Sequence, residues 1–125
     1  MMFWDEKAET IERGALVALQ LTRLQATVRR VARKVPRYHQ KFAESRVRPR
    51  DIRSLADLRR LPFTTNIDLR DTYPAGLLTV TPDEVLRLHT SSGTTGKPKA
   101  LFFTAKDVNN AAELMARCLV MTGVT

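Results

Sequence analysis

The chain has 125 residues, of which 43% are apolar and 27% charged, and its formal net charge is +8 at pH 7. This composition excludes a disordered chain and leaves room for one ordinary domain. The one cysteine excludes an internal disulfide and a cysteine-based zinc site.

The positive charge is concentrated in one part of the chain. Residues 21–60 hold 13 of the 21 Lys and Arg and only three acids, a local balance of +10. A solvated helical face is the ordinary interpretation of such a stretch, and binding of nucleic acid or another acidic partner is the alternative. No run of residues approaches the roughly 18 apolar residues of a membrane span. With no secretory signal at residues 1–7, we expect a cytoplasmic protein without a membrane partner.

Residues 1–84 are expected to form a helical and irregular region. Apolar residues recur at helical spacing over residues 13–34, which predicts a long amphipathic helix. Pro36 cannot continue that helix, so a break is expected there, followed by a short helix through Tyr38 and Phe42.

The stretch from residue 46 to 82 contains four prolines among short apolar groups. This pattern favours brief helical turns and extended links that wrap around the longer helices. Ser54 and Thr65 each precede a short apolar group, and a hydroxyl at such a position caps a helix start.

Residues 85–125 are expected to form a strand–loop–strand–helix unit. Residues 85–89 alternate as a strand does, and residues 100–103 form a second apolar strand. The two strands predict a hairpin with a long, specialised connection at residues 91–98. The fold class expected from these elements is α/β, as an α+β fragment.

Thr104 is placed to cap a helix that runs to about residue 122, where Gly123 ends it. Apolar residues lie nearly all round this helix, so we expect it to be buried on more than one side, partly by the helices at residues 13–44. Cys118 on this helix is interpreted as a small core residue. A helix of this kind also needs more protein around it than the chain supplies. We therefore expect self-association near Leu114, Met115 and Leu119, or contact with the remainder of an enzyme.

The connection between the strands carries the chemistry: Ser91-Ser92-Gly93-Thr94-Thr95-Gly96-Lys97-Pro98-Lys99. Glycines let backbone N–H groups converge, hydroxyls donate to phosphate oxygens, and lysines balance negative charge. The spacing of the glycines, and the proline after the first lysine, exclude a Walker A loop. The segment therefore indicates an anion-binding loop of another type.

This order of residues resembles the phosphate loop of the adenylate-forming superfamily. The segments around it are similar to the amino-terminal part of phenylacetate–CoA ligases, from about residue 16 onward, and the similarity is carried by residues 61–65, 68–70, Tyr73-Pro74 and Gly76-Leu77. Lys99 departs from the pattern, because many phenylacetate–CoA ligases have a smaller residue there. The aryl substrate is thus less strongly indicated than the reaction type.

The resemblance implies an AMP-forming acid–CoA ligase that uses ATP, Mg²⁺ and coenzyme A. An aromatic or other carboxylic acid becomes an acyl-adenylate, and coenzyme A then takes the acyl group. The loop would hold the β- and γ-phosphates, with Lys97 as the catalytic residue that stabilises the departing pyrophosphate. The other implied phosphate-binding residues are Ser91, Ser92, Gly93, Thr94, Thr95, Gly96 and Lys99, and no metal ligand is expected.

The resemblance further implies that residues 1–125 are an amino-terminal fragment of the large adenylation domain, inactive alone. The alternatives are a non-catalytic docking or oligomerisation piece and a basic nucleic-acid-binding module, the latter disfavoured. His89 precedes the loop and is interpreted as a strand-end residue bonded to backbone, with orientation of a loop hydroxyl as the alternative. His39 is expected at the surface.

Overall fold

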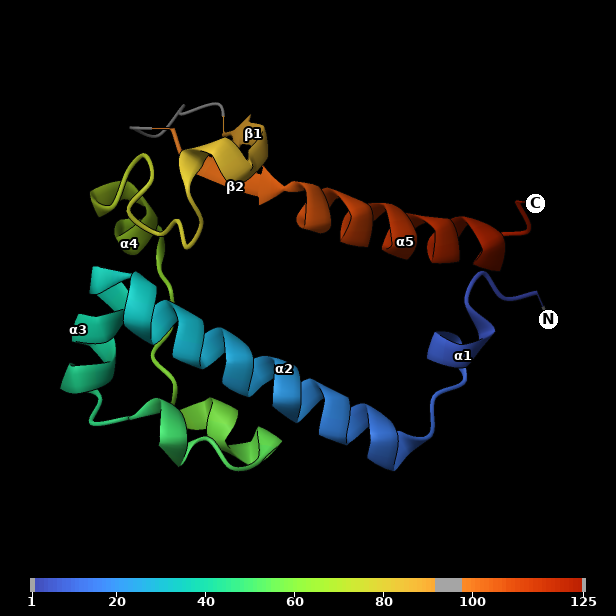
Figure 1. Cartoon of the computed structure of the whole chain (residues 1–125), viewed down its shortest axis with the longest axis horizontal. Helices are drawn as coiled ribbons and strands as arrows, with labels where there is room; N and C mark the ends of the chain where they lie inside the picture. The colour runs from blue at the N-terminus through green and yellow to red at the C-terminus, as the bar shows by residue number, and fades with distance from the viewer. Residues whose placement is uncertain (1, 92–97, 125) are drawn as a thin grey trace.

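The computed structural model describes residues 2–91 and 98–124, and Figure 1 shows their arrangement. Two long helices, α2 and α5, lie on opposite sides of the view, with the strand hairpin near one end and the short α1 near the other. The elements in chain order are α1 (Glu6–Glu9), α2 (Arg13–Lys34), α3 (Pro36–Glu44), the 3-10 turns η1 (Pro49–Asp51) and η2 (Leu55–Arg60), α4 (Asn66–Asp71), the 3-10 turn η3 (Pro82–Glu84), β1 (Val85–Thr90), β2 (Ala100–Thr104) and α5 (Ala105–Met121). Helices and short turns thus precede a strand–loop–strand–helix unit, which confirms the expected fold class.

The break between α2 and α3 lies at Val35, as predicted. Its backbone is extended, with φ −118° and ψ 106°, because the residue before a proline is biased away from helix. Pro36 then starts α3 in the first helical position, where its missing N–H costs nothing. The turn places Val35 inside the protein, where only 1% of its surface is exposed.

The hydrophobic core lies where α2, α3 and the chain around η1 meet. Four buried residues form its centre, Val28, Phe42, Val47 and Ile52, and partly buried residues pack against them, namely Leu21, Leu24, Val31, Ala32, Tyr38 and Leu61. The carbonyl of Ile52 accepts a 2.9 Å hydrogen bond from Gln25 Nε2, which fixes the link after η1 against α2. The core is therefore built from the basic segment of the chain.

The end of α3 leads the chain back into this core. Val47 N–H donates to Phe42 O at 2.9 Å, and Arg46 N–H donates to Ala43 O at 3.1 Å. This is a Schellman pattern, and it requires a left-handed residue in the position of Arg46, which has φ 52°. Val47 and Phe42 then meet in the core.

Both predicted ends of α5 are confirmed. Thr104 N–H donates to Asp107 Oδ2 at 2.9 Å, and Asp107 N–H donates to Thr104 Oγ1 at 3.3 Å, which is a capping box. Gly123 follows the helix with φ 90°, and Val124 N–H donates to Leu119 O at 3.1 Å. Only glycine adopts this left-handed position at no steric cost.

The expected burial of α5 is wrong for this chain. No residue of α5 is buried, and Met115 and Met121 are 59% and 78% exposed. Cys118, interpreted from the sequence as a core residue, is exposed as well. The physical reason is that α5 extends away from the end of β2 and contacts the amino-terminal segment, while α2 runs on the other side of the view (Figure 1).

The amino-terminal segment reaches the far half of α5 through polar contacts. Trp4 Nε1 donates to Glu113 Oε2 at 2.7 Å, and Arg117 Nη2 lies 3.4 Å from Asp5 Oδ2. Within the part of the chain that the structure describes, no helix is long and apolar enough to cross a membrane.

Candidate functional site

The two strands hold the ends of the predicted phosphate loop side by side. β1 and β2 pair antiparallel, and Thr90 opposite Ala100 is the last pair before the loop. Beyond it, Ser91 N–H donates to Lys99 O at 3.1 Å, and Lys99 N–H donates to Ser91 Oγ at 2.9 Å. The hairpin predicted from the sequence is thus confirmed, and its paired stem brings the start and end of the loop together.

Of the predicted phosphate-binding residues, the structure describes only these two ends. Ser91 and Lys99 lie at the top of the stem. Six others lie outside the described residues, namely Ser92, Gly93, Thr94, Thr95, Gly96 and Lys97. Their assigned roles therefore remain predictions.

Lys99 is held by a residue that sequence reasoning did not assign to the site. Its Nζ donates to Asn66 Oδ1 at 2.9 Å. Asn66 is the first residue of α4, 33 positions earlier in the chain. Because the partner is a neutral amide, this bond orients the ammonium group without neutralising its charge. An ammonium has three N–H donors, and among the described residues Lys99 Nζ uses one of them, on Asn66.

α4 is fixed in turn by a buried carboxylate. Asp68 is 1% exposed, and its carboxylate oxygens lie 2.7 Å from Arg37 Nε and 2.5 Å from Lys41 Nζ, both on α3. The same carboxylate accepts a 2.7 Å hydrogen bond from Thr65 N–H, and Thr65 Oγ1 accepts from Asp68 N–H. The Thr65 cap predicted from the sequence is confirmed as a reciprocal capping box.

The surroundings of Asp68 keep it ionised. The ammonium of Lys41 lowers the pKa of this carboxyl most, the backbone N–H of Thr65 and the guanidinium of Arg37 lower it further, and burial opposes them only in part. Lys41 Nζ also donates to Phe63 O at 2.6 Å. The arrangement therefore ties the chain before α4, and α4 itself, to α3.

These contacts form a continuous path from the core to the phosphate loop. α3 packs in the core, Asp68 joins α3 to α4, and Asn66 at the start of α4 holds Lys99. The Thr65-x-x-Asp68 spacing is typical of a helix cap. Nothing in the sequence indicated that the cations paired with Asp68 come from positions 31 and 27 residues away.

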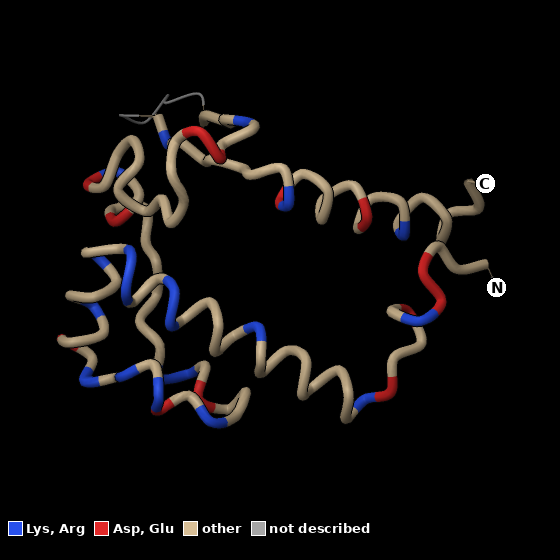
Figure 2. The backbone as a smooth tube through the Cα atoms, in the orientation of Figure 1, with Lys and Arg blue, Asp and Glu red and all other residues tan. Residues whose placement is uncertain are grey.

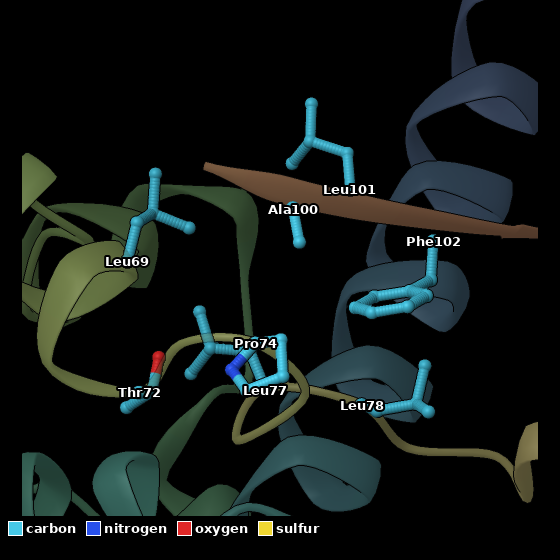
Figure 3. A pocket seen from close by; sticks show the side chains of 8 residues that line it. All are labelled: Leu69, Thr72, Pro74, Leu77, Leu78, Ala100, Leu101 and Phe102. Atoms are coloured by element: carbon cyan, nitrogen blue, oxygen red, sulfur yellow. The ribbon is translucent and has the colours of Figure 1, made fainter. Parts of the chain in front are cut away.

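A small cavity of about 180 Å³ lies between α4, the chain that follows it, and β2. Figure 3 shows its lining, which is mostly apolar and has Phe102 of β2 extending toward Leu78; the lining residues are Leu69, Thr72, Pro74, Leu77, Leu78, Ala100, Leu101 and Phe102. The volume is below the usual range for ligand pockets, and no charged residue lines the cavity to receive a carboxylate. We interpret it as a gap left by imperfect packing between β2, α4 and the chain that follows α4.

His89 is exposed at the end of β1, and its ring lies 4.9 Å from that of Phe103, at a tilt of 51°. The contact is with an aromatic neighbour on β2. His39 is exposed, as expected.

Solved structures place the fold among adenylate-forming ligases. A structure described as 2-hydroxyisobutyryl-CoA ligase in complex with 2-HIB-AMP and CoA is 29% identical, with a TM-score of 0.82 over 92% of this chain and 25% of that one. A second structure of this ligase, in the postadenylation state, is 25% identical with a TM-score of 0.85, over 98% of this chain and 26% of that one. The fold described above is thus that of part of an adenylate-forming ligase.

Sequence relatives narrow the class further. Phenylacetate-coenzyme A ligase of Thermus thermophilus is 45% identical over 122 residues, covering 98% of this chain and 27% of the relative. The enzyme of that name from Escherichia coli is 44% identical over 125 residues, covering 98% of this chain and 29% of the relative. No family model matches the chain. The chain is a homologue of phenylacetate–coenzyme A ligases and spans somewhat more than a quarter of their length, which confirms the resemblance seen in its sequence.

Proposed function

We propose that residues 91–99 bind the β- and γ-phosphates of ATP within a longer AMP-forming acid–CoA ligase. One observation carries the proposal: the paired stem at Ser91 and Lys99 closes a loop of phosphate-binding composition. The similarity to ligases named for phenylacetate and coenzyme A supports the reaction class. The carboxylic acid is then phenylacetate, another aromatic acid or another carboxylic acid, and coenzyme A accepts the acyl group.

The chemistry assigned to the loop is stabilisation of a leaving group. A carboxylate oxygen of the acid attacks the α-phosphorus of ATP, and the bond from that phosphorus to the bridging oxygen of the β-phosphate breaks. Pyrophosphate leaves with the electron pair, so negative charge grows on it during the step. In this proposal Lys97 and the loop hydroxyls receive this charge, and donors set in place beforehand lower the barrier.

The described residues fit a phosphate ligand at the loop's end. Asn66 orients the ammonium group of Lys99 through a neutral amide oxygen, so this contact adds no negative charge beside it. When bound, Mg²⁺ would offset charge on the phosphates. Among the described residues, no group of three His, Cys, Asp or Glu is placed to hold a metal, so we assign no magnesium ligand to this part of the chain.

A test is pyrophosphate exchange into ATP with phenylacetate, measured on the ligase that contains this segment and on the 125-residue chain. Exchange is expected from the former and absent from the latter. Asn66→Ala should lower the exchange rate and raise the KM for ATP while leaving the KM for phenylacetate unchanged. Lys106→Ala removes an exposed lysine of α5 and serves as the control. A raised phenylacetate KM in Asn66→Ala, with normal ATP kinetics, would reassign Asn66 and Lys99 to the acid site.

A second candidate function, self-association through α5, is favoured by one observation. Leu114, Met115 and Leu119 are 59%, 59% and 44% exposed on the same helix. Burial of such apolar area favours association at about 2.5 kcal/mol per 100 Å², before the cost of association is subtracted.

A further inference from the structure

A cluster of arginines lies on the basic segment of the chain, at α2 and the chain around η1. Four arginines surround one open hollow of about 440 Å³, formed by α2 and the chain around η1: Arg29, Arg48, Arg50 and Arg53. Within residues 2–91 and 98–124, no acidic residue lines this hollow. Figure 2 shows Lys and Arg along α2, α3 and the turns beside them.

Only one of the four arginines has its charge balanced nearby. Arg48 forms a salt bridge with Asp51, at 3.2 Å between Nε and Oδ2. Within residues 2–91 and 98–124, the guanidinium groups of Arg29, Arg50 and Arg53 contact no carboxylate. The hollow thus presents three uncompensated positive charges within one small surface.

The hollow is also partly organised without a ligand. Arg29 Nε donates to Gln25 O at 3.1 Å, which orients its guanidinium along α2. Gln25 in turn holds Ile52 O at 2.9 Å, so both walls are tied to the core. Pro49 lies among the arginines and supplies apolar surface, whereas Ile52, which is 1% exposed, lies beneath the hollow in the core.

Guanidinium groups are planar forks that bind phosphate oxygens in pairs, and they are less strongly hydrated than ammonium groups. Three of them around one hollow suit a ligand with two or three phosphates, and the ring of Pro49 gives an organic group apolar surface to contact. A surface for single-stranded nucleic acid would add aromatic side chains on which the bases stack. Among the described residues, no aromatic side chain lines this hollow.

We propose that the Arg29–Arg53 hollow, defined by the four arginines above, is a binding site for a small organic di- or triphosphate. The proposal does not depend on the role of residues 91–99. ADP is the probe, and inorganic pyrophosphate shows what the phosphates contribute alone. The charge-matched control removes two exposed arginines of the same basic segment that lie outside the hollow, as Arg33→Gln with Arg59→Gln.

Binding is measured by calorimetry on the chain carrying Lys97→Ala and Lys99→Gln, so that the phosphate loop does not contribute. Arginine Nε–H signals in nuclear magnetic resonance locate the ligand. We expect ADP to shift the signals of Arg29, Arg50 and Arg53, and Arg50→Gln with Arg53→Gln to weaken binding at least tenfold. The control pair should weaken it less than twofold.

Three results would overturn the proposal. Equal weakening by both double variants would mean that only net charge matters. Shifts confined to other arginines would place the anion elsewhere. Binding of a single-stranded oligonucleotide far tighter than ADP, lost equally in both double variants, would identify a nucleic-acid surface. Unchanged thermal unfolding of the variants shows that a loss of binding is not a loss of fold.

Discussion

The substitution Ile52→Ala tests whether the core between α2, α3 and η1 provides most of the free energy of unfolding. The side chain of Ile52 is 1% exposed, and Ile52→Ala removes three carbon atoms from the core. At about 0.8 kcal/mol per buried CH₂, the transfer loss is about 2.4 kcal/mol. The cavity left behind raises the expected loss of unfolding free energy to about 3–4 kcal/mol. The backbone carbonyl that Gln25 binds is unchanged by this substitution.

Ile67 provides a matched control, because it is 55% exposed and undergoes the same chemical change. About half of the transfer loss applies there, roughly 1 kcal/mol. The higher helix propensity of alanine in α4 returns a few tenths of a kcal/mol. The two variants should therefore differ by at least about 2 kcal/mol.

The measurement is urea unfolding followed by circular dichroism. With an m value of about 2 kcal/mol/M, the midpoint of Ile52→Ala should fall by roughly 1.5–2 M, with an unchanged slope. The midpoint of Ile67→Ala should fall by about 0.5 M or less. Equal shifts in the two variants would refute the reasoning, because stability would then not reside in this core.

Four further outcomes are expected. The stabilisation from the lowered pKa of Asp68 is present above the ordinary carboxyl pKa of about 3.9 and is lost as pH falls below it. The urea midpoint of Asp68→Asn should therefore vary less with pH between about 5 and 2 than the midpoint of the unsubstituted chain. Lys97→Ala in the ligase that contains this segment should lower the adenylation rate about 10²–10³-fold, with little change in the KM for the acid; the reverse pattern would place Lys97 at the acid. Arg46→Gly should stabilise the chain by about 1 kcal/mol in urea unfolding, because glycine adopts φ 52° without strain; a loss of stability would mean that the arginine side chain contributes more than the strain costs. Leu119→Glu should shift sedimentation toward the monomer, whereas Leu58→Glu, at a similarly exposed leucine of η2, should not; equal effects would place association elsewhere.

Local patterns in the sequence predicted the elements and their ends well. Pro36 marked the break after α2, Thr104 and Gly123 marked the ends of α5, alternation marked β1, and an apolar run marked β2. These signals depend on backbone geometry within a few residues, so they are readable without a fold. The short α1 and the conformation of Arg46 were not foreseen, since neither has a strong local signal.

Long-range features were the ones that the sequence did not reveal. The sequence around Asp68 predicts a helix start. The burial of its carboxylate depends on two cations of α3 that are distant in the sequence and close only in the fold. Asn66 reads as an ordinary first-turn residue until Lys99 is placed beside it. Cys118 was predicted to be buried and is exposed, because an apolar helix is buried only if another layer of the structure covers it.

The contacts of Trp4 and Asp5 with α5 join residues 109 and 112 positions apart. Closing so long a loop costs more entropy than forming any local turn, so these contacts are expected to form last during folding and to break first. They are polar and partly exposed to solvent, and salt screens such contacts over about 8 Å at physiological ionic strength. Native-state hydrogen exchange should therefore show the carboxyl half of α5 opening as a separate cooperative unit while amides around Val28 stay protected. Raising the salt concentration would speed exchange in α5 first, so ionic strength would control how often the two ends of the chain separate.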